Sequence, residues 1–290
     1  MLASTFFCIQ ENKNQMNLFV SDLDGTLLDK NAQLSDYSKN ILNNLMDNGM
    51  SFTIATARTI ATVSNILDGL KLNIPVILLN GALIRDTQND EYIFSAIIEK
   101  SVSDKVITLM HEFELYGFMY TIENDEMIPY YEKIATDEMR CFYEERKNKY
   151  YKRFYHTESF KLVNDKAVYF SLTNKYEKLL PLYEKIKDSD GIKLTFYRDV
   201  YNKGLWYLEI FSFYASKENA VNFLRAKYNF DRIICFGDNL NNIPLFNAGD
   251  KNYAVENACD ELKALADGII ASNTDNGVAN FLKDNYGKDF

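Results

Sequence analysis

Polar residues follow four apolar segments of the chain, each at the point where a strand would end. They form the clusters Asp22-Leu23-Asp24-Gly25-Thr26, Thr56-Ala57-Arg58, Asn80-Gly81 and Gly237-Asp238-Asn239-Leu240-Asn241-Asn242. In a parallel sheet, ligands bind beyond the carboxyl ends of the strands. If the apolar segments form one such sheet, all four clusters meet at a single edge. This convergence predicts a site for chemistry.

Asp22 and Asp24 are two residues apart on an extended segment and therefore point the same way. Two carboxylates so placed repel each other unless a cation lies between them, and hard oxygen ligands favour Mg²⁺ over zinc. One carboxylate can also be a nucleophile that forms an acyl phosphate, while the other serves as general acid and base. A plain Asp-Gly turn explains the whole cluster poorly, and a calcium loop would need Gly25 at another position.

Three further side chains suit a phosphate and its metal ion. Thr56 ends a strand, where its hydroxyl and the following backbone N–H groups could bind a phosphate oxygen; a helix N-cap is the simpler alternative. Lys217 follows Ser216 in the first turn of a predicted helix, where a cation opposes the helix dipole and so fits a bound anion. Asp238 is a natural third anionic metal ligand, or a cap of the loop that follows its strand.

The elements that must position these residues alternate between strands and helices. Strands are predicted at 18–20, 52–55 and 75–79, with helices from Ser35 to Gly49 and over 60–70 between them. The same alternation returns after residue 216, with strands at 233–236, 253–255 and 269–270 and helices after Ser216, at 244–248 and at 262–265. Such alternation predicts a parallel α/β sheet. The core therefore comprises 16–82 and 212–290, after an N-terminal extension of residues 1–15.

Residues 83–211 break this pattern and predict an inserted α+β unit. Most of the 20 tyrosines of the chain fall here, and half-exposed strands are predicted at 167–173, 193–197 and 205–210. The tyrosines could stack on a ring or bind sugar hydroxyls, although packing of a half-exposed sheet explains most of them better. The basic run from Arg146 to Arg153 is either an anion patch or, more simply, a solvated helix face.

Composition excludes several classes of protein. The 290 residues carry a net charge of −9, with 47% hydrophobic and 25% charged residues, which is typical of a globular chain of about two domains. The acidic balance argues against binding to nucleic acid or anionic membranes. Two histidines make a zinc site a poor fit. Four scattered cysteines and no apolar run of membrane-spanning length favour a cytoplasmic protein.

With these motifs in order, the chain resembles the haloacid dehalogenase superfamily, specifically its Cof-type (subfamily IIB) phosphatases, over residues 16–290. The resemblance implies a Rossmann-like parallel core with an inserted α+β cap, and a Mg²⁺-dependent phosphatase of small phosphorylated sugars or cofactors that works through an aspartyl-phosphate. It implies Asp22 as nucleophile and Asp24 as acid and base. The implied phosphate ligands are Thr56, Ala57, Lys217 and Asn241, the candidate substrate contacts Arg58 and Asn80, and the implied metal ligands Asp22, Asp24, Asp238 and Asn242.

The sequence departs from the family pattern at two positions. Ala57 stands where the family usually has glycine, and its backbone N–H can still meet a phosphate if its φ is negative. Asn242 stands where the family usually has Asp, so the site loses one negative charge and we expect a raised Mg²⁺ requirement. The alternatives are a sugar phosphomutase on the same scaffold and, because of Asn242, a catalytically silent protein that binds phosphorylated ligands. The oligomeric state is left open.

Overall fold

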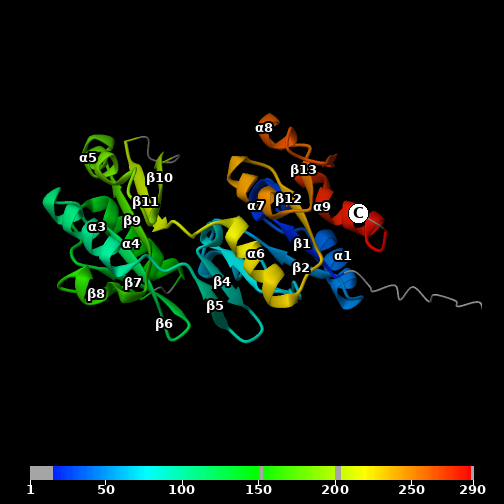
Figure 1. Ribbon diagram of the computed structural model, residues 1–290, viewed down its shortest axis with the longest axis horizontal. Helices are drawn as coiled ribbons and strands as arrows, with labels where there is room; N and C mark the ends of the chain where they lie inside the picture. The colour runs from blue at the N-terminus through cyan, green and yellow to red at the C-terminus, as the bar shows by residue number, and fades with distance from the viewer. Residues whose placement is uncertain (1–15, 151–152, 200–203, 289–290) are drawn as a thin grey trace, which may run out of the picture.

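Two lobes, a core and a cap, make up the computed structural model, which describes residues 16–150, 153–199 and 204–288 (Figure 1). The N-terminal extension expected at residues 1–15 lies outside the described residues. Both chain crossings between the lobes are short. The first lies near Ser95–Ile98 and the second near Ser212–Lys217.

The core lobe is built on a parallel sheet with the strand order β14-β13-β12-β1-β2. These strands are β1 (Asn17–Ser21), β2 (Ser51–Ile54), β12 (Arg232–Gly237), β13 (Lys251–Val255) and β14 (Gly268–Ile270). Phe19 of the central strand β1 lies opposite Ile234 of β12 and Phe52 of β2. The strands predicted for this half of the molecule are confirmed, and the parallel α/β core with them.

Helices cover both faces of the core sheet because successive residues of a strand point to opposite sides. Phe19 packs with α1 (Asp36–Asp47) and α9 (Gly277–Asn285). Leu18 and Val20 pack with the other layer, which consists of α6 (Lys217–Tyr228), α7 (Ile243–Ala248) and the short α8 (Asp260–Lys263). Ser35 caps α1 as predicted, since its hydroxyl accepts a hydrogen bond from the backbone N–H of Ser38.

The predicted helix over 60–70 is wrong in length. The helix α2 spans only Ile60–Val63, and turns follow it. Three of its four residues are β-branched, which lowers helix propensity. The Ser64 hydroxyl donates to the carbonyl of Ile60, which also accepts the backbone N–H of Ser64, and such a bond from a serine side chain disfavours a regular helix. The apolar residues between 60 and 70 therefore pack into the core from a segment of turns, although their spacing resembles that of a helix.

A hairpin extends the core toward the cap. Strand β3 (Val76–Leu78) pairs with β4 (Leu83–Asp86), which pairs with β5 (Glu91–Ser95), all antiparallel. A parallel bridge from Ala55 to Ile77 sets β3 beside β2. The cap expected to begin at residue 83 thus begins after β5, because β4 completes its hydrogen bonds with a core strand.

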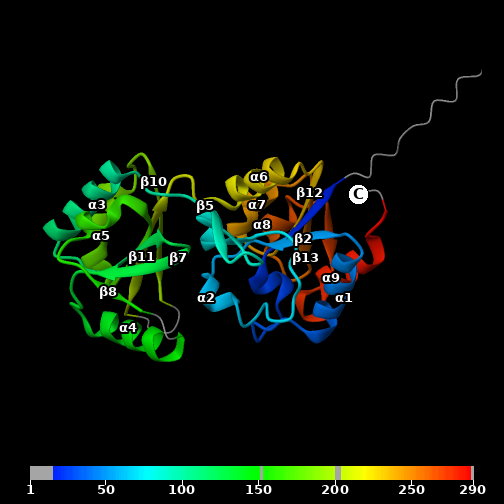
Figure 2. The same ribbon diagram turned by 90° about the horizontal axis from the view of Figure 1, so that it is seen from below.

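The cap is a six-stranded sheet with helices, in the order β10-β11-β9-β6-β7-β8. Its strands are β6 (Phe118–Glu123), β7 (Glu126–Tyr131), β8 (Tyr155–His156), β9 (Ala167–Asn174), β10 (Ile192–Arg198) and β11 (Trp206–Ser212). Its helices are α3 (Lys100–Glu112), α4 (Asp137–Tyr150) and α5 (Tyr176–Ile186). Figure 2 shows α3 and α5 on one side of this sheet and α4 on the other. The inserted α+β unit is confirmed.

The basic run predicted as a solvated helix face falls partly on α4. The guanidinium of Arg146 lies 5.0 Å from the centre of the Phe142 ring, and the ammonium of Lys147 lies 5.5 Å from that of Tyr143. Lys152 lies outside the described residues. Among the helices that the structure describes, none is both long and apolar enough to cross a membrane.

Candidate active site

The four polar clusters meet at the carboxyl edge of the core sheet, as the sequence predicts. Asp22 follows β1 directly, Thr56 follows β2, Asn80 follows β3 and Asp238 follows β12. The backbone N–H of Asn80 donates to the carbonyl of Thr56 at 2.9 Å, and Lys217 joins the edge as the first residue of α6. The backbone N–H of Asp22 donates to the carbonyl of Phe236 at 3.0 Å, which fixes the end of β1 beside that of β12. Residues more than half the chain apart are thus brought to one point.

Asp22 is the most enclosed carboxylate of this edge, with 3% of its surface exposed. Its Oδ1 accepts a hydrogen bond from the backbone N–H of Leu23 at 2.7 Å. Its Oδ2 lies 3.1 Å from Nζ of Lys217 and accepts a hydrogen bond from Nδ2 of Asn242. Donors on both oxygens fix the direction of this carboxylate.

Lys217 is buried with 1% of its surface exposed. Its ammonium forms the ion pair with Asp22, but among the described residues it finds no hydrogen-bond partner. The N-cap of α6 is Ser216, whose hydroxyl accepts a hydrogen bond from the backbone N–H of Glu218. A buried ammonium with unused N–H donors is costly unless an anion completes its shell, which fits a phosphate at this position.

Asp238 lies beside Asp22 with a single side-chain donor. Its Oδ1 accepts a hydrogen bond from Oγ1 of Thr26 at 3.1 Å. Burial, together with the charge of Asp22, raises the pKa of Asp238 to about 6. A divalent cation bound between two carboxylates in a half-buried site offsets the repulsion between their negative charges. The pair therefore fits a metal ion.

Gly25 allows the loop after β1 to lie close to the loop after β12, which carries Asp238. A Cβ at this position would lie 2.2 Å from Oδ2 of Asp238, and the backbone has a φ of +74°. The carbonyl of Gly25 accepts a hydrogen bond from the Asn257 amide at 2.7 Å, and the Asn273 amide donates to the carbonyl of Leu28 at 2.7 Å. Asn257 and Asn273, from the C-terminal part of the chain, thus hold the turn that carries Asp22 and Asp24.

Asn242 is fully buried and both ends of its amide have partners. Its Oδ1 accepts from the backbone N–H of Asp238 at 2.9 Å, while Nδ2 donates to Asp22. Across the described ranges, no three His, Cys, Asp or Glu side chains cluster closely enough to hold a metal ion. Asn242 and its exposed neighbour Asn241 keep their predicted metal and phosphate roles as predictions only.

Asp24 is turned toward Arg58. The guanidinium donates through Nε to one carboxylate oxygen at 2.8 Å and through Nη2 to the other at 2.5 Å. Asp24 is 51% exposed and Arg58 27%. The second carboxylate of the motif is thus the exposed one, available to a substrate, and Arg58 orients it.

Thr56 and Ala57 form the turn that carries Arg58. The Thr56 hydroxyl accepts from the N–H of Arg58 at 3.1 Å, which is an ST turn. The N-cap of the following helix α2 is Thr59, so the helix N-cap alternative for Thr56 is wrong. Ala57 is exposed and is not among the residues with positive φ, so the backbone condition for a phosphate contact is met, and the contact itself stays a prediction.

Asn80 carries an unusual backbone and an unpaired amide oxygen. Leu79 and Asn80 have φ values of +49° and +52°, which non-glycine residues seldom adopt. The Oδ1 of Asn80 is buried without a hydrogen-bond partner among the described residues. An acceptor without a partner is compatible with the predicted substrate contact of Asn80, which stays a prediction.

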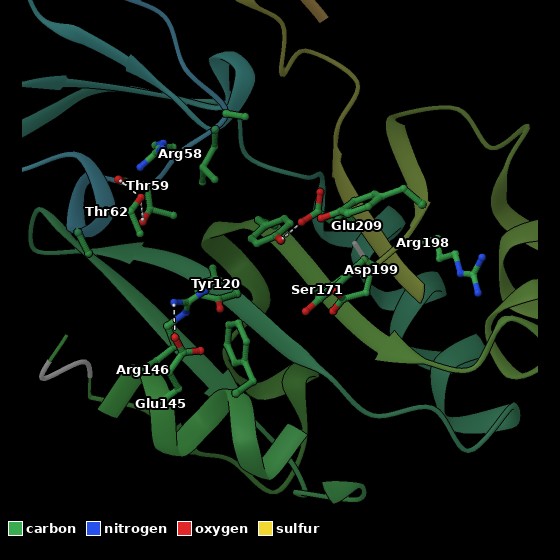
Figure 3. Close-up of a pocket in the computed structure, with 17 residues that line it drawn as sticks. Arg58, Thr59, Thr62, Tyr120, Glu145, Arg146, Ser171, Arg198, Asp199 and Glu209 are labelled. Atoms are coloured by element: carbon green, nitrogen blue, oxygen red, sulfur yellow. Dashed lines mark hydrogen bonds and ion pairs between the residues drawn. The ribbon is translucent and has the colours of Figure 1, made fainter. Parts of the chain in front are cut away.

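A cavity of about 600 Å³ lies between the lobes beside this edge (Figure 3). The core contributes Ala57, Arg58 and Leu79. The cap contributes a set of aromatic and polar side chains that includes Tyr120, Tyr169, Ser171, Tyr197, Tyr207 and Glu209. The sequence did not single out Glu209, since it does not stand at a strand end with polar neighbours. Thr26 belongs to the first polar cluster, but no role of its own was predicted for it.

Comparison with known proteins places the chain in a family. The sequence model of the haloacid dehalogenase-like hydrolases matches residues 19–282. The chain belongs to this family. Among its relatives, the Bacillus subtilis 5-amino-6-(5-phospho-D-ribitylamino)uracil phosphatase YwtE is 26% identical, over 92% of this chain and 97% of that protein. The Bacillus subtilis phosphatase YwpJ is also 26% identical, over 92% and 99%.

Solved structures show the same fold. The crystal structure of TM0651 from Thermotoga maritima superposes with a TM-score of 0.73 at 23% identity, over 94% of this chain and 98% of that one. The predicted haloacid dehalogenase fold and family are confirmed. The predicted enzyme class, a phosphoric monoester hydrolase of this family, is confirmed with them.

Proposed function

We propose that this hydrolase is a Mg²⁺-dependent phosphatase of a small phosphorylated metabolite and works through an aspartyl-phosphate on Asp22. The observation that carries the proposal is the environment of Asp22: a buried carboxylate held by Leu23, Lys217 and Asn242 at the carboxyl edge of the sheet. Such a group is fixed for attack on phosphorus, and the ammonium beside it suits the charge of the transferring group.

The proposed reaction has two steps. An oxygen of Asp22 bonds to phosphorus as the bond from phosphorus to the leaving-group oxygen breaks, and the Asp24 carboxyl gives its proton to that oxygen. A water then attacks the phosphorus, its proton passes to Asp24, and the bond to Asp22 breaks to release phosphate. We assign Thr56, the N–H of Ala57, Lys217 and Asn241 to the phosphoryl oxygens, and Arg58 and Asn80 to the substrate.

The donor set fits a hard divalent cation. Asp22, Asp238 and the main-chain carbonyl of Asp24 would hold Mg²⁺, with Asn242 beside them. When bound, the ion would offset the charge of the phosphoryl group. Because Asn242 supplies no charge, this set has two carboxylates, and we propose that the enzyme needs more Mg²⁺ than one with a third.

Two further parts of the proposal concern substrate and location. The relative named above acts on a phosphorylated ribitylamino-uracil, and we extend to this chain only the general class, a phosphorylated small molecule. Cys141, Cys235 and Cys259 carry free thiols in the structure, which supports a reducing, cytoplasmic location.

Phosphate release from 4-nitrophenyl phosphate, titrated with Mg²⁺, tests the proposal. We expect turnover that requires Mg²⁺ and falls by at least about a thousandfold in Asp22→Asn, whose shape is conserved. Asp188→Asn, an exposed residue of the cap, is the matched control and should behave as wild type. Turnover that survives in Asp22→Asn rejects the nucleophile. Binding of phosphorylated ligands without any turnover at high Mg²⁺ selects the silent binding protein, and an isomerised sugar phosphate without free phosphate selects the mutase.

A further inference from the structure

The two faces of the cap sheet differ in chemistry because neighbouring residues of a strand alternate between them. Met119, Phe170, Leu208 and Ile210 lie in the apolar cluster that α3 and α5 cover. The residues between them point the other way. Tyr120, Tyr169 and Glu209 therefore share the face that lines the cavity toward the core.

Glu209 lies among tyrosines on this face. Its Oε1 accepts a hydrogen bond from the hydroxyl of Tyr169 at 2.5 Å, and the hydroxyl of Tyr197 donates to the same carboxylate. Tyr169 stacks between Tyr120 and Phe211, with ring centroids 5.0 and 4.7 Å away. Burial raises the pKa of Glu209. The aromatic stacks fix this carboxylate in direction.

No described Lys or Arg forms an ion pair with Glu209. Its two described partners are phenol hydroxyls, and a carboxylate has about four lone-pair positions. Glu209 is half-buried and faces the cavity, and its carboxylate can still accept further hydrogen bonds. A donor from a bound ligand would satisfy this remaining capacity. In Figure 3, Arg58 and Thr62 approach the cavity from the core side and Tyr120, Ser171 and Glu209 from the cap side.

Among the described residues that line the cavity, acidic and basic side chains are equal in number, so they give the cavity no excess of positive charge. The described lining residues include three acids, Glu145, Asp199 and Glu209, and three bases, Arg58, Arg146 and Arg198. Arg58 is already bound by Asp24 through two hydrogen bonds, and Arg146 lies 3.7 Å from Glu145. A negative group beside Glu209 would meet an uncompensated carboxylate.

We propose that Glu209 determines substrate specificity by accepting a hydrogen bond from a hydroxyl or amine of the leaving group, so that the cavity rejects a substrate with a second anionic group at its far end. This inference rests on the proposed function, because the phosphate that is cleaved must bind at Asp22 and Lys217. The tyrosine faces beside Glu209 then cover the carbon skeleton of a polyhydroxylated leaving group.

Matched substrates test the inference. Glucose 6-phosphate and glucose 1,6-bisphosphate differ only by a second phosphate, and 4-nitrophenyl phosphate lacks hydroxyls on its leaving group. For the wild type we expect kcat/KM for glucose 6-phosphate to exceed both other values by at least about tenfold, since like charges brought together and unmade hydrogen bonds are both costly. If the monophosphate has no advantage, the inference is rejected.

The variant Glu209→Gln keeps the size and the carbonyl acceptor but removes the charge. We expect the preference for the monophosphate over the bisphosphate to fall from at least about tenfold to within about threefold. Glu177→Gln makes the same change at an exposed position on α5 and should keep the wild-type preference. A preference that is equal in Glu209→Gln and wild type contradicts the inference. Should Glu209→Gln fail to fold, the wild-type comparison alone decides.

A binding measurement separates this inference from the proposed function. Calorimetric titration of the Asp22→Asn protein with the two glucose phosphates reports the preference without any turnover. If the Asp22→Asn protein prefers the monophosphate although the wild type cleaves no phosphoester, the specificity role stands and hydrolysis falls. If 4-nitrophenyl phosphate is cleaved through Asp22 but neither kinetics nor titration shows the preference, hydrolysis stands and the role of Glu209 falls.

Discussion

The amide of Asn242 donates a hydrogen bond to Oδ2 of Asp22, the oxygen that also meets the ammonium of Lys217. The other end of the same amide accepts the N–H of Asp238. Asn242 therefore couples the two carboxylates of the site through one buried side chain. An aspartate at this position would offer no donor to Asp22.

Replacement of Asn242 by Asp should trade stability for metal affinity. In the presence of EDTA, Asn242→Asp places a buried carboxylate against Asp22, and we expect a loss of about 1–3 kcal/mol in the free energy of unfolding. With Mg²⁺, the added charge should lower the half-saturating concentration several-fold. Thermal unfolding titrated with Mg²⁺ measures both effects. Asn40→Asp adds the same charge on an exposed face of α1 as a control, and equal Mg²⁺ midpoints in all three proteins would reject the prediction.

Arg58 should act on catalysis far more than on stability. Its pair with Asp24 is partly exposed, and such pairs contribute only about 0–1 kcal/mol. Arg58→Gln removes the fork that orients Asp24, and we expect kcat to fall about tenfold with little change in melting temperature. Arg58→Lys, which keeps the charge without the fork, should give an intermediate kcat. A parallel loss of kcat and melting temperature in Arg58→Gln would indicate a structural role instead.

Gly81 holds the turn after β3 against the start of α6. Its φ is +94°, and a Cβ there would lie 2.1 Å from the carbonyl oxygen of Ser216 and 2.7 Å from the N of Lys217. Gly287 has a similar φ of +89° but no atom within 4 Å of the added Cβ. We expect Gly287→Ala to cost about 1 kcal/mol, from the backbone alone, and Gly81→Ala at least about 3 kcal/mol. Urea unfolding gives both values, and equal losses would mean that the contact with Ser216 relaxes freely.

Cys235 and Cys141 should react very differently with alkylating agents. Cys235 is buried in β12, and burial raises the pKa of its thiol well above the ordinary value. Because the thiolate is the reactive form, iodoacetamide at pH 8 should leave Cys235 unmodified in the folded protein. Cys141 is exposed on α4 and should be alkylated. Peptide mass spectrometry before and after unfolding in urea reads out each site, and early labelling of Cys235 would contradict its burial.

The core and its polar edge were predictable because they rest on local signals. Asp22, Asp238 and Thr56 each follow an apolar run, and parallel strands bring such ends together whatever the sequence between them. Buried Lys217 was predictable for a related reason, since a cation in the first turn of a helix has no local benefit. The family resemblance added the roles that these residues have in related proteins.

The cap cavity was not predictable in the same way. Glu209 is the one carboxylate in the largely aromatic strand β11. Its proposed role depends on Tyr169 and Tyr197, which lie on the two neighbouring strands. Their register depends on pairings between segments that no local pattern defines. The length of α2 was predicted wrongly because a local pattern was present but ambiguous: apolar spacing typical of a helix also arises in a packed turn.

The central strands β1 and β12 have a consequence for how the chain is made. Met16 and Asp231, which are hydrogen bonded at the start of these strands, are 215 residues apart. All strands of the cap lie between them in the sequence. During synthesis every strand of the cap is made before β12, so β1 cannot pair with β12 until the whole inserted lobe has been made. The inserted lobe is therefore synthesised in full before the sheet of the core lobe can be completed.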